Sequence, residues 1–243
     1  MDDQAGKKPS TDQGLSIDIF TVLGHDLKSP LNAVESYLEI LRNRVLGDGL
    51  DPYMQILENS VARLHQMREL ITDVVDWSKI QQPSSPRPLV ALDISKMAQS
   101  IMDSYVKEAE GRNITLSTDI EDGLFMKAVG RDIELILRHL IGNAIRYNKD
   151  NGSVTLTIKK ADSHIAVKVA DTGIGLSAED QARLFQEFVR IKNSKTQDIR
   201  GTGLGLAIVK KLVELYHGKV SLRSEPDIGT TFSLILFSGD GTS

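Results

Sequence analysis

Hydrophobic residues recur every seven positions along the first third of the chain. Two interleaved rows contain Phe20, Leu27, Val34 and Leu41, and Leu31, Leu38 and Val45. This spacing is typical of the a/d seam of a packed helix. The segment GDGLDP, residues 47–52, supplies two glycines and a proline that end one helix and begin the next. A second, less regular pair of rows follows in residues 54–75, so the pattern predicts a long antiparallel helical hairpin.

A lone hairpin of this kind buries only one side of each helix. Two hairpins that pair into a four-helix bundle bury both apolar stripes, so the sequence predicts a homodimer. The alternative is that the hairpin packs on the C-terminal domain of its own chain.

The segment QQPSSPRP, residues 81–88, cannot continue the helix because it holds three prolines. It therefore predicts a domain boundary. The expected organisation is a disordered leader (1–15), a helical hairpin (16–82), a linker (83–90), a second domain (91–238) and a disordered tail (239–243).

The second domain mixes two periodicities. Helical patterns cover residues 93–111, 131–148 and 205–219, and alternating strand patterns cover 113–120, 152–171 and 229–237. Because helices and strands do not alternate strictly, we expect an α+β sandwich with helices on one face of one sheet.

Composition narrows the function classes. A chain of 243 residues favours two unequal domains. Its formal net charge of -4 shows no excess of basic residues, so the composition does not support nucleic-acid binding. The absence of cysteine excludes disulfides and thiolate metal sites. No apolar run approaches the ~20 residues that span a bilayer, and the polar start MDDQAGKKPSTDQ is no signal peptide. We therefore expect no membrane contact by this segment and a cytoplasmic location, either for this chain alone or as the cytosolic part of a larger protein.

Glycine gathers at two places in the second domain. VADTGIGL (169–176) follows a predicted strand, and RGTGLGLAIVK (200–210) precedes a predicted helix. Glycines that admit a ligand beside a helix N-terminus are typical of a phosphate site. The P-loop pattern is absent, and the GxGxxG/A match at Gly173, Gly175 and Ala178 lacks the acidic residue at the end of a following strand that dinucleotide-binding folds have.

Six short motifs then point to a known family. In chain order they are HDLKSPL (25–31), HLIGNAIRY (139–147), DTGIG (171–175), LFQEFVRI (184–191), GTGLGL (201–206) and GTTF (229–232). Their identity, order and spacing resemble the catalytic core of a sensor histidine kinase. That core is a HisKA-type dimerisation and phosphotransfer hairpin followed by a GHKL-type ATP-binding domain, and the match covers Phe20 to Phe237.

The resemblance implies roles for three residues of the first motif. His25 would take the γ-phosphoryl group of ATP on its Nε2, and Asp26 would orient the ring and accept its other proton. Ser29, one turn later, would help to align water for dephosphorylation of the partner.

The resemblance also implies an ATP site in the second domain. Asp171 would accept a hydrogen bond from the adenine amino group, Tyr147 would pack near the adenine, Arg146 would meet a phosphate, and Asn143 would hold Mg²⁺ through its amide oxygen. The remaining residues that it assigns to the site are Gly173, Gly175, Leu176, Arg190, Gly201, Thr202, Gly203, Leu204, Gly205, Leu206 and Thr230. Residues 176–201 would form a mobile lid with Phe185 and Phe188 as its apolar anchors.

One residue departs from the family pattern. The family usually has asparagine at the position of His139, four residues before Asn143 on the same helix face. His139 either contacts Mg²⁺ or a phosphate, or fills space.

The resemblance thus implies a homodimeric protein histidine kinase that autophosphorylates on His25 from Mg-ATP and passes the phosphoryl group to an aspartate of a response regulator receiver domain. No sensor domain is recognisable in the chain, so an upstream sensor domain or protein would supply the signal. Two alternatives are a GHKL ATPase without histidine phosphorylation and a nucleotide-binding dimeric scaffold.

Overall fold

The computed structural model describes residues 12–43, 51–81, 87–191, 193–197, 199 and 201–237. Contacts divide the chain into two compact units, Met1–Thr72 and Asp73–Ser243. The tail expected from residue 239 and the first half of the expected linker, residues 83–86, lie outside the described residues.

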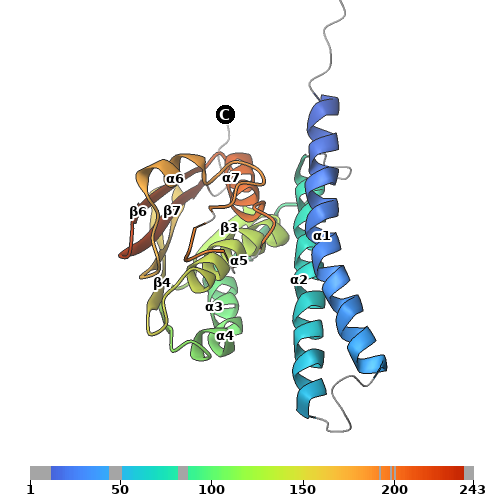
Figure 1. Ribbon diagram of the computed structural model, residues 1–243. Coiled ribbons are helices and arrows are strands. Elements are labelled where there is room, and N and C mark those ends of the chain that lie inside the picture. The colour runs from blue at the N-terminus through green and yellow to red at the C-terminus, as the bar shows by residue number, and fades with distance from the viewer. Residues whose placement is uncertain are drawn as a thin grey trace, which may run out of the picture. The chain divides into compact units, whose positions relative to one another are not determined.

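The first unit contains helix α1 (Asp12–Arg42) and most of helix α2 (Asp51–Gln81), which run antiparallel as a hairpin (Figure 1). Helix α1 begins inside the segment expected as a leader. The expected turn between the helices falls on residues 44–50, which lie outside the described residues.

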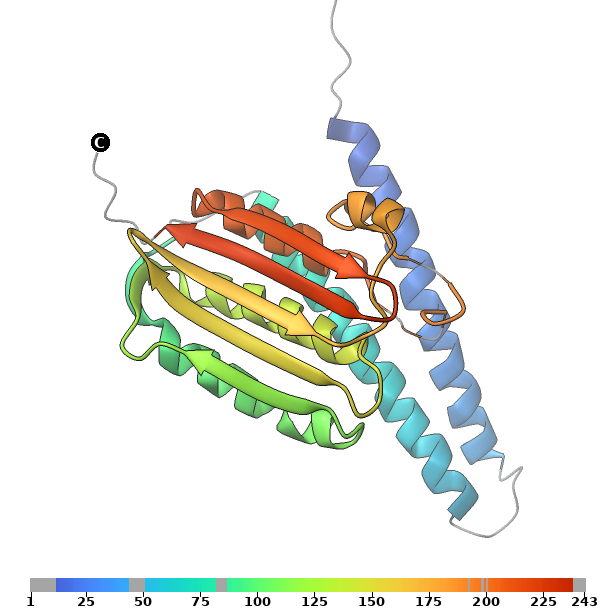
Figure 2. The ribbon, with the colours of Figure 1, turned by 90° about the vertical axis from the view of Figure 1, so that its left-hand side faces the viewer.

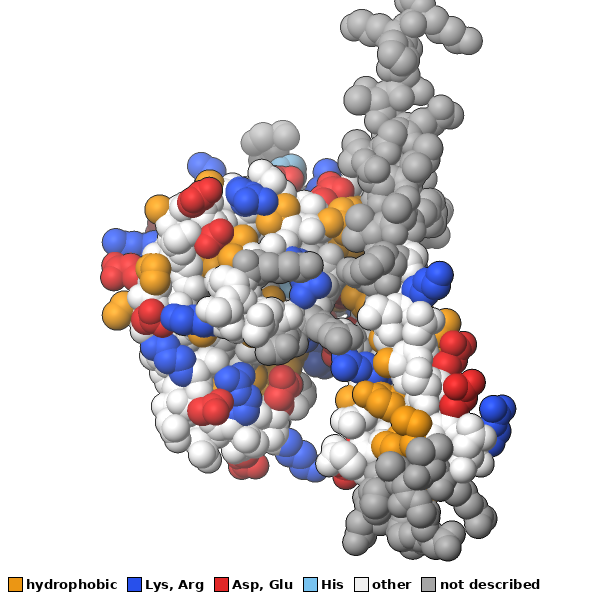
Figure 3. Space-filling model, viewed as in Figure 1, with side chains coloured by type: hydrophobic (Ala, Val, Ile, Leu, Met, Phe, Trp, Pro, Cys, Tyr) orange, Lys and Arg blue, Asp and Glu red, His pale blue; other side chains and the backbone are white. Residues whose placement is uncertain are grey.

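One face of the hairpin is apolar and exposed in the single chain. Figure 3 shows hydrophobic side chains on the surface of the two helices. The large ones, each between 42% and 53% exposed, are Leu31, Leu38, Met54, Leu57, Val61, Leu64, Ile71 and Val75. These residues belong to the seven-residue rows. The contacts within the single chain therefore leave part of the apolar seam uncovered.

The second unit is built on a five-stranded sheet with the order β2-β4-β5-β7-β6. Strands β2 (Thr115–Ile120) and β4 (Ser153–Ala161) are parallel, and the other neighbours are antiparallel. The remaining strands are β5 (His164–Asp171), β6 (Lys219–Glu225) and β7 (Gly229–Phe237), and a separate antiparallel pair, β1 (Val90–Asp93) with β3 (Phe125–Ala128).

Helices cover one face of this sheet, as Figure 2 shows. They are α3 (Ile94–Ser104), α4 (Val106–Glu110), α5 (Gly130–Arg146) and α7 (Gly205–Leu215). Alternate residues of β4, such as Leu156 and Ile158, are buried against apolar residues of α5, such as Ile136 and Leu140, in one core. The expected α+β architecture with helices on one face is confirmed.

Several elements differ from the sequence-based expectation. The single helix expected over residues 93–111 is interrupted at Tyr105, whose N–H bonds to Met102 O, one residue nearer than α-helical geometry requires. Strands β1, β3 and β6 were not predicted, and neither was helix α6 (Ala178–Arg183). The two short strands have four residues each, too few for a clear period.

Candidate active site

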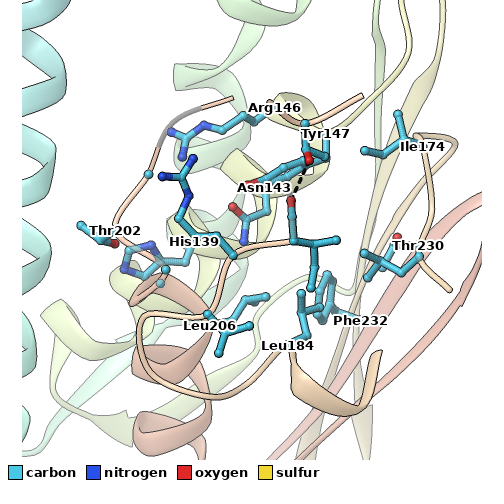
Figure 4. A pocket seen from close by; sticks show the side chains of 18 of the residues that line it. His139, Asn143, Arg146, Tyr147, Ile174, Leu184, Thr202, Leu206, Thr230 and Phe232 are labelled. Atoms are coloured by element: carbon cyan, nitrogen blue, oxygen red, sulfur yellow. Dashed lines mark hydrogen bonds between the residues drawn. The ribbon is translucent and has the colours of Figure 1, made fainter. Parts of the chain in front are cut away.

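A pocket opens in the second unit between helix α5, the start of helix α7 and the ends of strands β5 and β7 (Figure 4). It brings together residues that are far apart in the sequence. The expected site residues that line it are Asn143, Arg146, Tyr147, Asp171, Gly175, Leu176, Arg190, Gly201, Thr202, Gly203, Gly205, Leu206 and Thr230.

Two expected residues do not line the pocket. The side chain of Leu204 is fully buried in the core. Gly173 is buried behind Asp171 and donates its backbone N–H to Asp171 Oδ1 at 2.8 Å. Both residues therefore adjoin the pocket without lining it.

Asp171 ends strand β5 at the apolar end of the pocket, beside Ile174, Leu184 and Phe232. Its Oδ1 accepts two backbone hydrogen bonds, from Gly173 N–H and from Thr230 N–H at 3.2 Å. Among the described residues, no hydrogen bond reaches Oδ2. Burial raises the pKa of the Asp171 carboxyl to about 6, although the two backbone bonds act in the opposite direction. An acceptor of this kind in an apolar pocket suits a flat ligand with an amino group, and the adenine base has one.

The first glycine box is fixed by close backbone contacts. Gly175 has a φ of +61°, and a Cβ at this position would lie 1.8 Å from Glu225 O. The turn after strand β6 also bonds to this segment, since Asp227 N–H donates to Ile174 O at 2.8 Å. Only glycine allows the loop to lie this close to strand β6.

Helix α5 supplies the polar side of the pocket. His139, Asn143 and Arg146 lie four and three residues apart, so their side chains share one helix face (Figure 4). Arg112 holds the end of this helix, because its guanidinium donates to Ile145 O at 2.8 Å and to Asn148 O at 2.7 Å. These bonds satisfy carbonyls at the helix C-terminus and fix the position of Arg146.

The second glycine box leads into helix α7, which begins at Gly205. Its N-cap residue is Leu204, whose side chain makes no capping hydrogen bond. Free N–H groups and the helix dipole make such a terminus suitable for an anion. The arrangement therefore places an amino-group acceptor and an anion-binding helix end around the same pocket.

The expected lid contains helix α6 and a folded loop. The Phe185 ring packs edge-on to the Phe232 ring, with 6.2 Å between the ring centroids. Phe188 is also partly buried against the core. Arg190 donates from its guanidinium to Ile199 O at 2.6 Å. Lys192, Asp198 and Arg200 lie outside the described residues.

The residues expected to carry the phosphoryl group lie in helix α1. The side chains of His25 and Asp26 lie outside the described residues. Ser29 is exposed and is followed by Pro30 inside the helix. The roles of these residues stay predictions.

Sequence reasoning missed several residues of the pocket. These are Asp73, Ile174, Leu184, Val189, Ile191, Asn193, Thr196 and Phe232. The alternation in GTTFSLILF puts Phe232 on the buried face of its strand and could have identified it. Asp73 gave no such signal, because it comes from the end of helix α2.

Metal ligands are sparse in the described part of the chain. No three or more histidine, cysteine, aspartate or glutamate side chains gather there in a way that could hold an ion. Mg²⁺ at Asn143 would therefore need phosphates and water to complete its coordination.

Within the described residues, no helix is both long and apolar enough to cross a membrane.

The fold and the pocket define an ATP-binding domain of the histidine kinase-, DNA gyrase B-, and HSP90-like ATPase family, whose family model matches residues 128–239. The model of the His Kinase A (phospho-acceptor) domain matches residues 17–83. The chain therefore belongs to the sensor histidine kinases of two-component systems, as the motifs predicted.

Relatives and solved structures agree with this assignment. The sensor-like histidine kinase SenX3 of Mycolicibacterium smegmatis is 29% identical over 89% of this chain and 56% of its own length. The Acinetobacter baumannii histidine kinase AdeS has the same fold, with a TM-score of 0.68 at 19% identity over 89% of this chain and 98% of that one. Histidine kinase ThkA, solved in complex with the response regulator TrrA, has a TM-score of 0.65 at 21% identity over 93% of this chain and 64% of that one. The chain spans between about a quarter and a little over half of the length of the curated relatives that it matches.

Proposed function

We propose that this chain is the catalytic core of a histidine kinase that autophosphorylates on His25 from ATP. The observation that carries the proposal is the pocket with Asp171 at its apolar end and the second glycine box at the start of α7, in a chain that also has the HDLKSPL motif in helix α1. The pocket supports binding of ATP, and the motif supports His25 as the acceptor of the phosphoryl group.

The proposed orientation follows from the chemistry of the pocket. The adenine amino group donates to Asp171 Oδ2, and the apolar walls cover the base. The triphosphate extends toward Arg146 and the N-terminus of α7, where positive charge and free N–H groups neutralise it. Mg²⁺, held by Asn143 and the phosphates, would neutralise further charge on them.

The proposed transfer conserves atoms and charge. The lone pair of His25 Nε2 forms a bond to the γ-phosphorus, the bond from phosphorus to the bridging oxygen breaks, and the electron pair leaves with ADP. The imidazole then loses its Nδ1 proton to the Asp26 carboxylate. Positioning and charge neutralisation, rather than covalent help from further residues, provide most of the acceleration in such transfers.

The partners also belong to the proposal. The exposed apolar rows of α1 and α2 support a homodimer through the hairpin, because pairing would bury them. The ThkA complex supports a response regulator as the acceptor of the phosphoryl group. We place the reaction in the cytoplasm, where ATP is available.

The test is incubation with Mg-ATP labelled on the γ-phosphate, followed by acid and base treatment of the protein. Wild-type protein should retain label that acid removes and base does not, because a phosphoramidate hydrolyses in acid. His25→Gln should retain none, and Ser36→Ala is a matched control, since Ser36 is exposed on the same helix three turns further on.

Three other results would contradict the proposal. ATP turnover by both wild type and His25→Gln without retained label would indicate a GHKL ATPase. ATP binding with neither turnover nor label would indicate a nucleotide-binding scaffold. Label retained by His25→Gln would place the acceptor elsewhere in the chain.

A further inference from the structure

The end of helix α2 belongs to the same compact unit as the nucleotide pocket, because that unit begins at Asp73. Trp77 and Ile80, one and two turns further along, are buried in the core of this unit. Asp76 forms an ion pair with Arg131 at the start of α5, at 2.8 Å. The last turns of α2 are thus held firmly, and they carry Asp73 to the wall of the pocket.

Asp73 engages the second glycine box directly. Thr202 Oγ1 donates a hydrogen bond to Asp73 Oδ2 at 2.6 Å. The same hydroxyl oxygen accepts the Leu204 N–H at 3.0 Å. A hydroxyl has only one hydrogen, so Thr202 cannot donate to Asp73 and to a phosphate at once.

His139 lies on the other side of the Asp73 carboxylate. Its Nε2 is 3.9 Å from Asp73 Oδ1 and, within the described residues, is a buried polar atom without a hydrogen-bond partner. Its ring packs against Gly205, where a Cβ would lie 2.9 Å from His139 Nδ1. This contact joins His139 to the first residue of α7, and burial lowers the pKa of the imidazole. A neutral ring leaves the Asp73 charge uncompensated by His139.

Asp73 therefore places a carboxylate where the site is built to receive an anion. It accepts the hydrogen bond of the Thr202 hydroxyl, and it lines the same pocket as Gly201, Gly203 and Gly205. A triphosphate in the proposed orientation would meet this negative charge and would compete with it for the same donor.

We propose that Asp73 competes with the phosphates of ATP for the second glycine box, so that the end of helix α2 determines how tightly the pocket holds phosphorylated nucleotides. Adenosine, which has no phosphate, does not compete with Asp73. This inference rests on the proposed orientation of ATP, and it adds a determinant that the nucleotide-binding motifs do not contain. Binding of ATP and docking of α2 through Asp73 are then mutually unfavourable.

The test measures the affinities of ATP, ADP and adenosine by calorimetry with the full chain, in Mg²⁺ and again in EDTA. Asp73→Asn removes the charge but keeps an acceptor for Thr202, and Asp73→Ala removes both. We expect Asp73→Asn to tighten ATP binding by about fivefold, Asp73→Ala by at least as much, ADP binding to tighten less, and adenosine binding to stay unchanged. The matched control is Asp76→Asn, three residues further along α2, which loses its ion pair with Arg131 and does not line the pocket.

The ratio of ATP to adenosine affinity separates this inference from other effects. An unchanged ratio in the Asp73 variants would overturn it, and so would an equal change for Asp76→Asn, which would indicate general loosening of α2. Weaker ATP binding by Asp73→Asn in Mg²⁺ alone would assign Asp73 to the metal and overturn it too. If the wild-type protein bound neither ATP nor adenosine, the proposed nucleotide site itself would fail, and the inference with it.

Discussion

At the residue scale, the burial of the Asp171 carboxyl group lowers the stability of the fold at neutral pH. Its carboxyl group is largely buried, and its pKa is raised to about 6 because burial disfavours the charged form. The unfolded chain ionises the same group near its ordinary pKa of 3.8. This group therefore stabilises the fold fully below pH 3.8 and loses that contribution as pH rises through about 6.

Asp171→Asn should consequently stabilise the free protein at pH 7, by about 1–3 kcal/mol, since asparagine carries no charge to bury. Its amide oxygen can still accept the N–H groups of Gly173 and Thr230. The gap between variant and wild type should shrink as pH falls from about 6 and vanish below about 4, which urea unfolding at several pH values measures. Asp150→Asn is the control, because Asp150 is 71% exposed and pairs with Arg112.

The same substitution should weaken nucleotide binding. With the amide oxygen occupied by backbone donors, the NH₂ group faces the pocket and meets the amino group of adenine, so two donors oppose each other. We expect adenosine affinity to fall about 30-fold or more. Wild-type affinity for adenosine should also fall below about pH 6, where Asp171 takes up a proton. Adenosine binding that is equal for both proteins and independent of pH would contradict the assignment of Asp171.

At the element scale, the sequence predicted the long periodic elements and missed the short ones. Helix α5 was expected over residues 131–148 and runs from Gly130 to Arg146. The prediction was close because buried apolar residues recur along this segment at helical spacing. The two-stranded pair of β1 and β3 was missed, because strands of four residues give no reliable alternation.

The candidate site was predictable to the extent that its residues belong to short motifs. Residues such as Asp171 and Thr202 lie in glycine-rich segments that local sequence identifies. Asp73 lies in an ordinary helical pattern, and its place beside Thr202, 129 residues away, results from tertiary packing. Sequence reasoning also left two roles open for His139, because its surroundings, Gly205 and Asp73, come from other elements.

The apolar face of the hairpin supports a prediction about assembly. Leu64 is 50% exposed in the single chain and belongs to one of the seven-residue rows. In a homodimer through this face, Leu64→Glu would bury an unpaired charge in both copies, and we expect the dissociation constant of the dimer to rise about 100-fold or more. Light scattering over a dilution series measures this change. Asn59→Glu, at an exposed position on the opposite side of α2, is the control, and equal dissociation of both variants would contradict an interface on this face.

At the scale of the whole molecule, the two units should respond to different conditions. The hairpin unit, Met1–Thr72, carries most of the proposed dimer interface, and the unit Asp73–Ser243 carries the pocket. A unit that is folded only with its partner gains stability with protein concentration, and a unit that binds ligand gains stability with ligand concentration.

Thermal unfolding should therefore show two transitions that move independently. Raising the protein concentration should shift only the transition of the helical hairpin, which far-ultraviolet circular dichroism follows. Adding adenosine at about 100 times its dissociation constant should stabilise the pocket unit by about 2.7 kcal/mol and shift only the second transition, which the fluorescence of Trp77, in the core of that unit, reports. Helix α2 passes from one unit into the other without a break, so it is the element through which the transitions would become coupled. A single transition that shifts with both protein and ligand concentration would mean that α2 makes the two units unfold as one, and it would contradict their independence.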